Sequence, residues 1–314
     1  MQAPVNLFCI FPIRFEKKHF ALKNLILLHI VVLIFGFTAI LGKLITIEAE
    51  PLVWYRMLIA SVAIFIYLKF KRTKLLLSLK GGLVTFFTGF IIAAHWICFF
   101  EAINQSNVSV TLASLSTAAL FTAILEPLFF KRKIQLYELL LGFMVIVGLY
   151  FIFAFEPENS IGIYLAILAA FLASLFTVIN GRLIKRFSSG IISFYELSGG
   201  VIAISLYFLF FKPNSFPSFD LSLNDAIYIG ILGVICTAFA FVASVKVMQE
   251  LTPFTVSLSI NLEPVYGILM ALVIFGDEEK MSAGFYTGAL LILCSIFLNV
   301  IVKRRKKRNH MGEL

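Results

Sequence analysis

The chain has 314 residues, of which 61% are hydrophobic and 35 are phenylalanine, and its formal net charge is +9. A water-soluble domain of this length cannot bury so many apolar side chains, and the mean hydropathy of +0.99 therefore excludes a soluble globular protein. The composition predicts a membrane protein whose positive charge contacts an anionic membrane surface, not nucleic acid.

Apolar stretches of about 20 residues, the length that spans a bilayer as a helix, occur ten times along the chain. In chain order we predict spans at 24–45, 51–69, 81–103, 108–130, 137–155, 161–181, 190–211, 225–249, 253–275 and 282–302. Residues 1–23 form a predicted cytoplasmic segment, because their cations follow an apolar run, whereas a signal peptide begins with its cations. Whether these residues belong to the native start is left open. The predicted fold class is an all-α polytopic membrane protein.

Basic residues predict the orientation of these spans. All but four of the 26 Lys and Arg residues fall on the side of the membrane that holds the N-terminus; the exceptions are Lys43, Arg56, Lys212 and Lys280. Because positively charged segments stay in the cytoplasm, we predict a multi-pass protein of the inner (plasma) membrane with both termini cytoplasmic. The run "KRRKKR" lies in a predicted basic tail, 303–314, and we interpret it as a stop-transfer anchor instead of a nuclear signal.

The two halves of the chain resemble each other. "ILGKLI" (40–45) matches "INGRLI" (179–184), and "FFEAINQSNVSVTLAS" (99–114) overlays "VKVMQELTPFTVSLSI" (245–260). We therefore predict two five-helix repeats, 24–155 and 160–302. Because five is odd, the second repeat enters the membrane inverted, which is a recurring architecture of secondary transporters.

A further match, of "VWYRM" (53–57) with "SFYEL" (193–197), places Arg56 of the first repeat opposite Glu196 of the second. Each lies about five residues inside its span, or roughly 7–8 Å from the interface. Two interpretations stay open. Both side chains could snorkel to the headgroups, or they could line opposite mouths of a central pathway and contact a charged solute.

Glu263 lies near the middle of the ninth span, where a charged side chain costs about 2.5–3.5 kcal/mol on insertion scales. Pro264 removes a backbone donor and predicts a kink. The surrounding "TVSLSINLEP" adds Ser259 and Asn261, a polar content that fits a helix lining a watery cavity. Glu263 is interpreted either as a proton carrier or as a structural carboxylate bonded to neighbouring hydroxyls.

Further polar residues lie in the other spans. The fourth span is rich in hydroxyls, and Glu126 near its end is predicted to pair with the cations of 131–133. His95 is interpreted either as a packing residue or as a contact for protons or solute. The complete predicted substrate pathway is Arg56, His95, Trp96, Ser114, Thr117, Asn180, Glu196, Ser259, Asn261, Glu263 and Tyr266, with Pro264 as the helix kink.

Several segments together resemble the EamA family of the drug/metabolite transporter superfamily: "WYRMLIA" (54–60), "FFEAINQSNVSV" (99–110) and "NLEPVYGILMALVIFGDEE" (261–279). The first-half counterpart, "SLSTAALFTAILEPLFFKRK" (114–133), has Ala118 where the family often has proline, and it lacks the acidic end. The resemblance implies a ten-span carrier, often an exporter of amino acids or related metabolites, whose pathway lies between spans 1–4 and 6–9. Spans 5 and 10 would be peripheral.

We therefore expect a secondary active transporter that exports a small polar metabolite by alternating access, with proton coupling, and that is not an enzyme. The alternatives are an intramembrane enzyme, for which HExxH and GxSxG motifs are missing, and a non-transporting membrane scaffold. The expected partners are a small-molecule solute, protons and membrane lipid, and not nucleic acid. The four cysteines show no CxxC or Cys/His spacing, so no cofactor, metal or disulfide is expected. Whether two copies form a homodimer is left open.

Overall fold

The computed structural model describes residues 11–133, 135–213 and 221–312, and these residues form helices and short connections without a β-strand. Eight helical stretches are long and apolar enough to cross a membrane, and two shorter apolar helices, Leu140–Phe155 and Ala283–Ser295, complete a set of ten. The all-α polytopic fold predicted from the sequence is confirmed.

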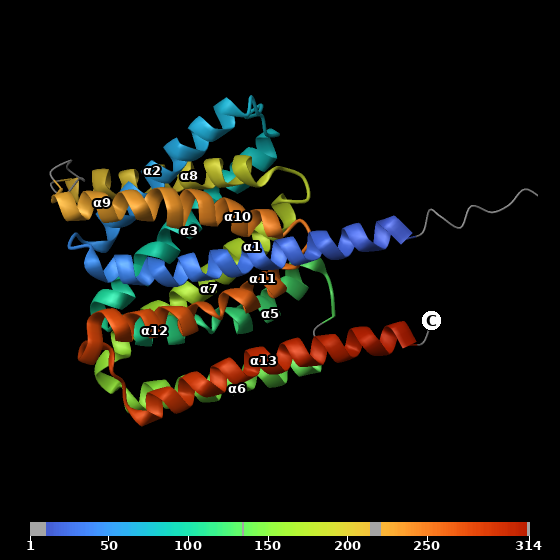
Figure 1. Ribbon diagram of the computed structural model, residues 1–314. Helices are drawn as coiled ribbons and strands as arrows, with labels where there is room; N and C mark the ends of the chain where they lie inside the picture. Colours follow the sequence, from blue (N-terminus) through green and yellow to red (C-terminus); the bar gives the residue numbers. More distant parts are fainter. Residues whose placement is uncertain (1–10, 134, 214–220, 313–314) are drawn as a thin grey trace, which may run out of the picture.

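Each half of the chain contributes five of these ten membrane segments (Figure 1). The first half consists of α1 (Phe11–Leu44), α2 (Ala49–Phe70), α3 (Leu79–Gln105), α4 (Val108–Leu115), α5 (Ala118–Phe130) and α6 (Leu136–Phe155). The second half consists of a 3₁₀ turn, η2 (Pro157–Asn159), then α7 (Ser160–Leu183), α8 (Ser189–Phe211), α9 (Leu223–Ile231), a π-helical stretch, η4 (Leu232–Phe239), α10 (Ala240–Val247), α11 (Pro253–Ile260), α12 (Glu263–Phe275), a 3₁₀ turn, η5 (Gly276–Glu279), and α13 (Ala283–Gly312). The predicted spans 4, 8 and 9 are therefore not continuous α-helices.

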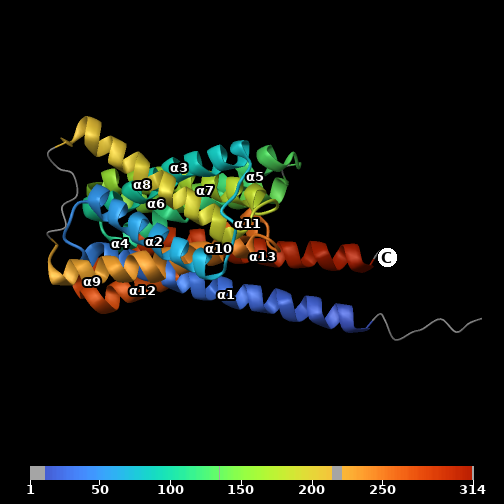
Figure 2. The same cartoon turned by 90° about the horizontal axis from the view of Figure 1, so that it is seen from above.

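The two terminal helices are longer than the predicted spans. α1 begins at Phe11, not at residue 24, because no helix breaker follows Pro12, which stands in the first turn where proline is tolerated. α13 continues to Gly312 through a run of Lys and Arg, which are good helix formers. Residues 1–10 of the predicted cytoplasmic segment, with Cys9, lie outside the described residues. Figures 1 and 2 show that α1 begins and α13 ends at the same end of the bundle.

The halves pack through matching pairs of helices. α1 packs along α12, and its counterpart in the second half, α7, packs along α5. Two further pairs join equivalent helices, α2 with α8 and α6 with α13, and the two broken spans pack crosswise, α5 with α11 and α4 with α12. Since each half crosses the bundle five times, equivalent helices run in opposite directions, and the two repeats are inverted relative to each other.

Glycine allows the closest crossings between helices. A Cβ atom on Gly89 of α3 would overlap the carbonyl oxygen of Glu196 in α8, and one on Gly199 of α8 would overlap that of Phe86 in α3. The backbones of α3 and α8 thus touch, as small residues permit in membrane helices. α6 and α13 meet in the same way at Gly148 and Gly288, each of which would collide with the other's carbonyl oxygen if it carried a Cβ.

Candidate functional site

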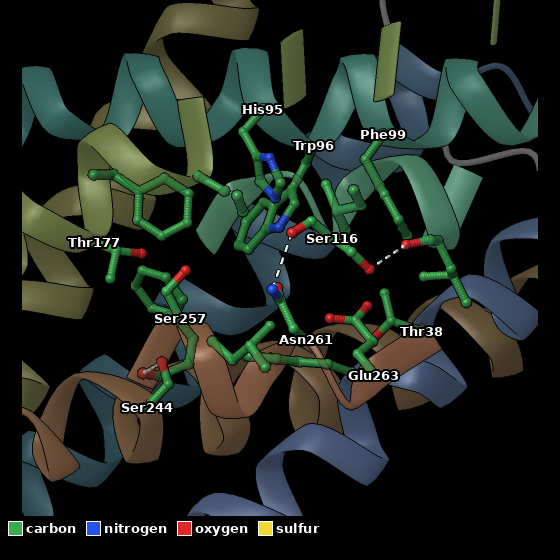
Figure 3. A pocket seen from close by; sticks show the side chains of 18 of the residues that line it. Thr38, His95, Trp96, Phe99, Ser116, Thr177, Ser244, Ser257, Asn261 and Glu263 are labelled. Atoms are coloured by element: carbon green, nitrogen blue, oxygen red, sulfur yellow. Dashed lines mark hydrogen bonds between the residues drawn. The ribbon is translucent and has the colours of Figure 1, made fainter. Parts of the chain in front are cut away.

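A cavity lies between the two halves. Both repeats line it, and α6 and α13 contribute none of its residues among those described. In Figure 3, His95, Trp96 and Phe99 of α3 enter from one side, and Asn261 and Glu263 enter from the opposite side. Below, the inner end of the bundle is the one at which α1 begins and α13 ends, following the predicted orientation, and the outer end is the opposite one.

Two broken helices meet in the cavity wall. The first interruption, at Ser116 and Thr117, separates α4 from α5, and the second, at Asn261 and Leu262, separates α11 from α12. Pro264, in the first turn of α12, has no N–H for the carbonyl of Ile260, which explains the second break. At the cavity the Asn261 side-chain amide donates a 2.9 Å hydrogen bond to the carbonyl oxygen of Ser116 (Figure 3).

The break between α4 and α5 forms although residue 118 is alanine. The Thr117 hydroxyl donates to the carbonyl oxygen of Ser114 at 2.8 Å, and the Ser116 hydroxyl donates to that of Leu112 at 3.3 Å. Such bonds from hydroxyls to the helix's own carbonyls bend helices. The first repeat therefore reaches the same broken geometry as the second without a proline.

Arg56 of α2 lies inside the protein, with 1% of its surface exposed. Its guanidinium carbon lies 3.9 Å from the centre of the Trp96 ring, and its Nε donates a 3.0 Å hydrogen bond to Thr237 Oγ1. Its Nη1 has no hydrogen-bond partner among the described residues. The side chain therefore does not snorkel to the interface: it forms a cation–π contact in the cavity wall and keeps one donor unused.

Thr237, the partner of Arg56, sits in the π-helical stretch η4. Its hydroxyl donates a 2.7 Å hydrogen bond to the carbonyl oxygen of Leu232, five residues earlier, so its lone pairs face Arg56 Nε. The wide turn of a π-helix is a recurrent feature of functional sites. The stretch contains Gly233 but no proline, and Thr237 was not among the predicted pathway residues.

Glu263, the first residue of α12, also lines the cavity and is 6% exposed. A helix N-terminus favours a negative charge, which makes this a tolerable place for a carboxylate. Within the described part of the chain, the carboxylate accepts no hydrogen bond and forms no ion pair. The cavity thus holds one cation from the first repeat and one anion from the second, and neither neutralises the other by direct contact.

His95 and Asn180 line the cavity as well, and a hydrogen bond to a residue outside the cavity lining orients each side chain. The Nδ1 of His95 lies 2.8 Å from the carbonyl oxygen of Ala169, which makes Nδ1 the protonated nitrogen. The Asn180 amide donates a 3.3 Å hydrogen bond to Glu196, whose carboxyl group is fully buried. Glu196 therefore lies behind Asn180, and it reaches neither the headgroups nor the cavity surface.

The remaining predicted residues lie near the cavity but not among its lining residues. Ser114 and Thr117 are buried at the first break, and the Ser259 hydroxyl donates to the carbonyl oxygen of Thr255 at 3.0 Å within α11. Tyr266 packs against the apolar core. The lining residues that were not predicted are Phe35, Thr38, Phe99, Leu112, Leu115, Ser116, Ala118, Ala173, Phe176, Thr177, Phe241, Ser244, Val245, Met248, Ser257 and Ile260.

A bundle of ten apolar helices in two inverted repeats, with a charged cavity between them, defines the class of polytopic membrane transporters. The chain belongs to the EamA-like transporter family, whose model matches residues 22–154 and 160–301. The family resemblance seen in the sequence is therefore confirmed, and the protein is a membrane transporter.

Three relatives from Bacillus subtilis (strain 168) carry names of the same kind. The chain is 23% identical to the uncharacterized transporter YxxF over 290 residues, covering 89% of this chain and 90% of that one. It is 27% identical to the uncharacterized transporter YdfC (73% and 74% covered) and 22% identical to the uncharacterized transporter YoaV (88% and 96% covered). A solved crystal structure superposes with a TM-score of 0.66 at 15% identity, over 89% of this chain and 97% of that one, and shares the fold.

Proposed function

We propose that the protein is a secondary active transporter that exports a small polar metabolite, an amino acid or a related compound, across the cytoplasmic membrane by alternating access coupled to protons. The observation that carries this proposal is the pair of opposite charges, Arg56 and Glu263, which line one cavity without a direct ion pair. A solute with a carboxylate and an ammonium group complements both.

The unused Nη1 of Arg56 gives the solute carboxylate its binding site. Guanidinium groups bind carboxylates through strong charge-assisted hydrogen bonds, and the Trp96 face and Thr237 hold this one in a fixed orientation. The ammonium group of the solute binds at the Glu263 carboxylate. Each buried charge carries a desolvation cost of several kcal/mol, and a zwitterion offsets both costs at once.

The same carboxylate supports coupling to protons. Glu263 binds either a proton or the solute ammonium group, since both compete for its oxygens. A solute leaving through the cavity is therefore exchanged for a proton that returns on Glu263. Because Arg56 comes from the first repeat and Glu263 from the second, rocking of one repeat against the other changes both contacts together.

The direction of export follows from the proposed exchange with protons, because a solute exchanged for an entering proton moves outward. In the proposed orientation both termini and the basic segments face the cytoplasm of a bacterial-type inner membrane. The inner end of the cavity wall includes Asn180 near the end of α7 and Met248 directly after α10. The solute enters from this side and leaves past the start of α4 at the outer end.

A counterflow assay in proteoliposomes tests the proposal. Vesicles that contain the purified protein and an internal pool of mixed amino acids are offered each labelled amino acid in turn, alongside its analogues without the carboxylate or the amine. We expect uptake of one or more intact zwitterions, with at least roughly tenfold less for either analogue, because each lacks one charge-assisted contact. If both analogues were taken up as fast as the intact amino acid, or if no amino acid showed counterflow, the proposed substrate class would be overturned.

A further inference from the structure

Two buried carboxylates, one at each end of the bundle, join the two repeats. At the outer end, Glu279 of η5 is fully buried and accepts hydrogen bonds from the first two N–H groups of α4, those of Val108 at 3.1 Å and Ser109 at 2.9 Å. Lys43, in the last turn of α1, lies 3.0 Å from the same carboxylate. A residue of the second repeat thus holds two helices of the first.

At the inner end, the carboxylate comes from the first repeat, as Glu126 of α5, and the helix that it caps comes from the second. Glu126 is 6% exposed, and it accepts a 2.6 Å hydrogen bond from the N–H of Phe254 at the start of α11. Its other oxygen lies 3.4 Å from Arg132 Nε, which confirms the ion pair predicted for Glu126. A residue of the first repeat therefore caps a helix of the second.

These two carboxylates are not equivalent in the sequence. The overlay of 99–114 on 245–260 places Lys133, not Glu126, opposite Glu279. A cation cannot accept an N–H hydrogen bond from a helix start. The segment directly after α5 carries only cations at 131–133, and Glu126, seven residues before Lys133 within α5, caps α11 instead.

The capped helices flank the two ends of the cavity. α4 and α12 supply Leu112 and Glu263 to its wall on the outer side of the breaks, while α5 and α11 supply Ala118 and Ser257 on the inner side. The bonds of Glu279 thus tie the start of α4 to η5, which directly follows α12, at the outer end, and the bond of Glu126 ties α5 to the start of α11 at the inner end.

We infer that Glu279 is the outer latch and Glu126 the inner latch of the pathway, and that each must release its helix start before that end opens. The inference rests on the proposed alternating access. The outer latch is the stronger, because it has two backbone donors and a cation from the other repeat. Among the described residues the inner latch has the N–H of Phe254 as its backbone donor, and its cation, Arg132, belongs to its own repeat.

Labelling of a thiol in the cavity tests the inference. Thr38→Cys, in a chain whose four native cysteines are replaced by alanine, is exposed to a membrane-impermeant thiol reagent from either side, in right-side-out and inverted vesicles. We expect Glu279→Ala to raise the labelling rate from the outside by roughly tenfold and Glu126→Ala to raise it from the inside, because hydrogen bonds to charged groups shift an equilibrium by about this factor. Each rate from the opposite side should not rise.

Matched controls remove single carboxylates that cap no helix. Glu278→Ala removes an exposed acid that also reaches Lys43, at 3.2 Å, and Glu250→Ala removes an exposed acid at the inner end. Both should label at the parent rate. If an alanine variant does not insert, Glu279→Gln and Glu126→Gln replace it, with the same expectation at smaller amplitude.

The inference is overturned if either latch variant labels at the parent rate, or if one variant opens both sides equally. Labelling uses no solute, so its outcome is independent of the counterflow assay. Side-specific labelling together with absent counterflow would reject the proposed substrate class alone, while active counterflow with unchanged labelling would reject the latches alone.

Discussion

The side-chain amide of Asn261 donates a 2.9 Å hydrogen bond to the carbonyl oxygen of Ser116, and this bond joins the two helix breaks across the cavity. Each break leaves backbone groups without their helical partners, and here one break supplies the donor for the other's acceptor. The middle of the pathway wall is therefore a shared contact of the two repeats, not a pair of independent kinks.

Asn261→Ala removes this contact and leaves the carbonyl oxygen of Ser116 with the longer, 3.4 Å hydrogen bond from the N–H of Ala119. We expect a loss of about 0.5–1.5 kcal/mol in stability, the net contribution of a typical hydrogen bond. The measurement is the melting temperature of the purified protein in detergent, compared with that of Asn224→Ala, which alters an exposed asparagine. Equal melting temperatures for the two variants would show that the bond does not stabilise the breaks.

Glu263→Gln keeps the shape of the side chain but removes its ability to exchange a proton. In proteoliposomes we expect flux driven by a pH gradient to be abolished, while insertion and the elution profile stay unchanged. Glu158→Gln, which alters an exposed carboxylate at the outer end, is the control and should keep full activity. Undiminished gradient-driven flux in Glu263→Gln would reject the proton-carrying role.

Arg56→Lys and Arg56→Leu separate charge from geometry. Lysine keeps the cation but loses the planar stacking on Trp96 and the bond from Nε to Thr237, so we expect reduced transport with a raised KM. Leucine removes the anion-binding group, and we expect almost no transport. Initial rates of solute uptake measure both. Equal activity of the two variants would contradict an anion contact at Arg56.

Gly199→Ala tests the backbone contact between α3 and α8. The added methyl group would collide with the carbonyl oxygen of Phe86, and overpacking of this kind costs typically 1–3 kcal/mol. We expect a lower melting temperature in detergent and a lower yield of inserted protein. Gly230→Ala is the matched control, because nothing lies within 4 Å of a Cβ at that position. Equal melting temperatures and yields for Gly199→Ala and Gly230→Ala would show that the contact between α3 and α8 tolerates the methyl group.

The sequence alone predicted the features that depend on composition and on isolated charges. Apolar length gave all ten spans, and the cost of a charge in a bilayer singled out Arg56 and Glu263, which line one cavity in the structure. The predicted ion pair of Glu126 with a cation of 131–133 is also present. These properties are local, so they can be recognised without knowing which helices are neighbours.

Features that depend on neighbouring helices could not be predicted. The aromatic lining by Phe99 and Phe241 gives no signal in a chain with 35 phenylalanines. The π-helical turn at Thr237 depends on a hydroxyl bond within one helix and a guanidinium from another. The position of Glu196 in its span predicted its depth and left open a place at a pathway mouth, but depth does not determine that Asn180 stands between its carboxyl group and the cavity.

The reciprocal approach of Gly148 and Gly288 has a consequence for how such a chain could arise. Each glycine makes room for the other's backbone, yet the two are not equivalent positions, because the overlay that sets Lys133 against Glu279 sets Cys294 against Gly148 and Gly142 against Gly288. Two identical copies of a five-helix ancestor, related by a twofold axis, would have to make this contact twice, but Gly142 faces Leu120 of its own repeat instead. The contact between Gly148 and Gly288, like the acid at Glu126 set against Lys133, is therefore an asymmetry that two identical chains cannot have and that two diverged repeats can.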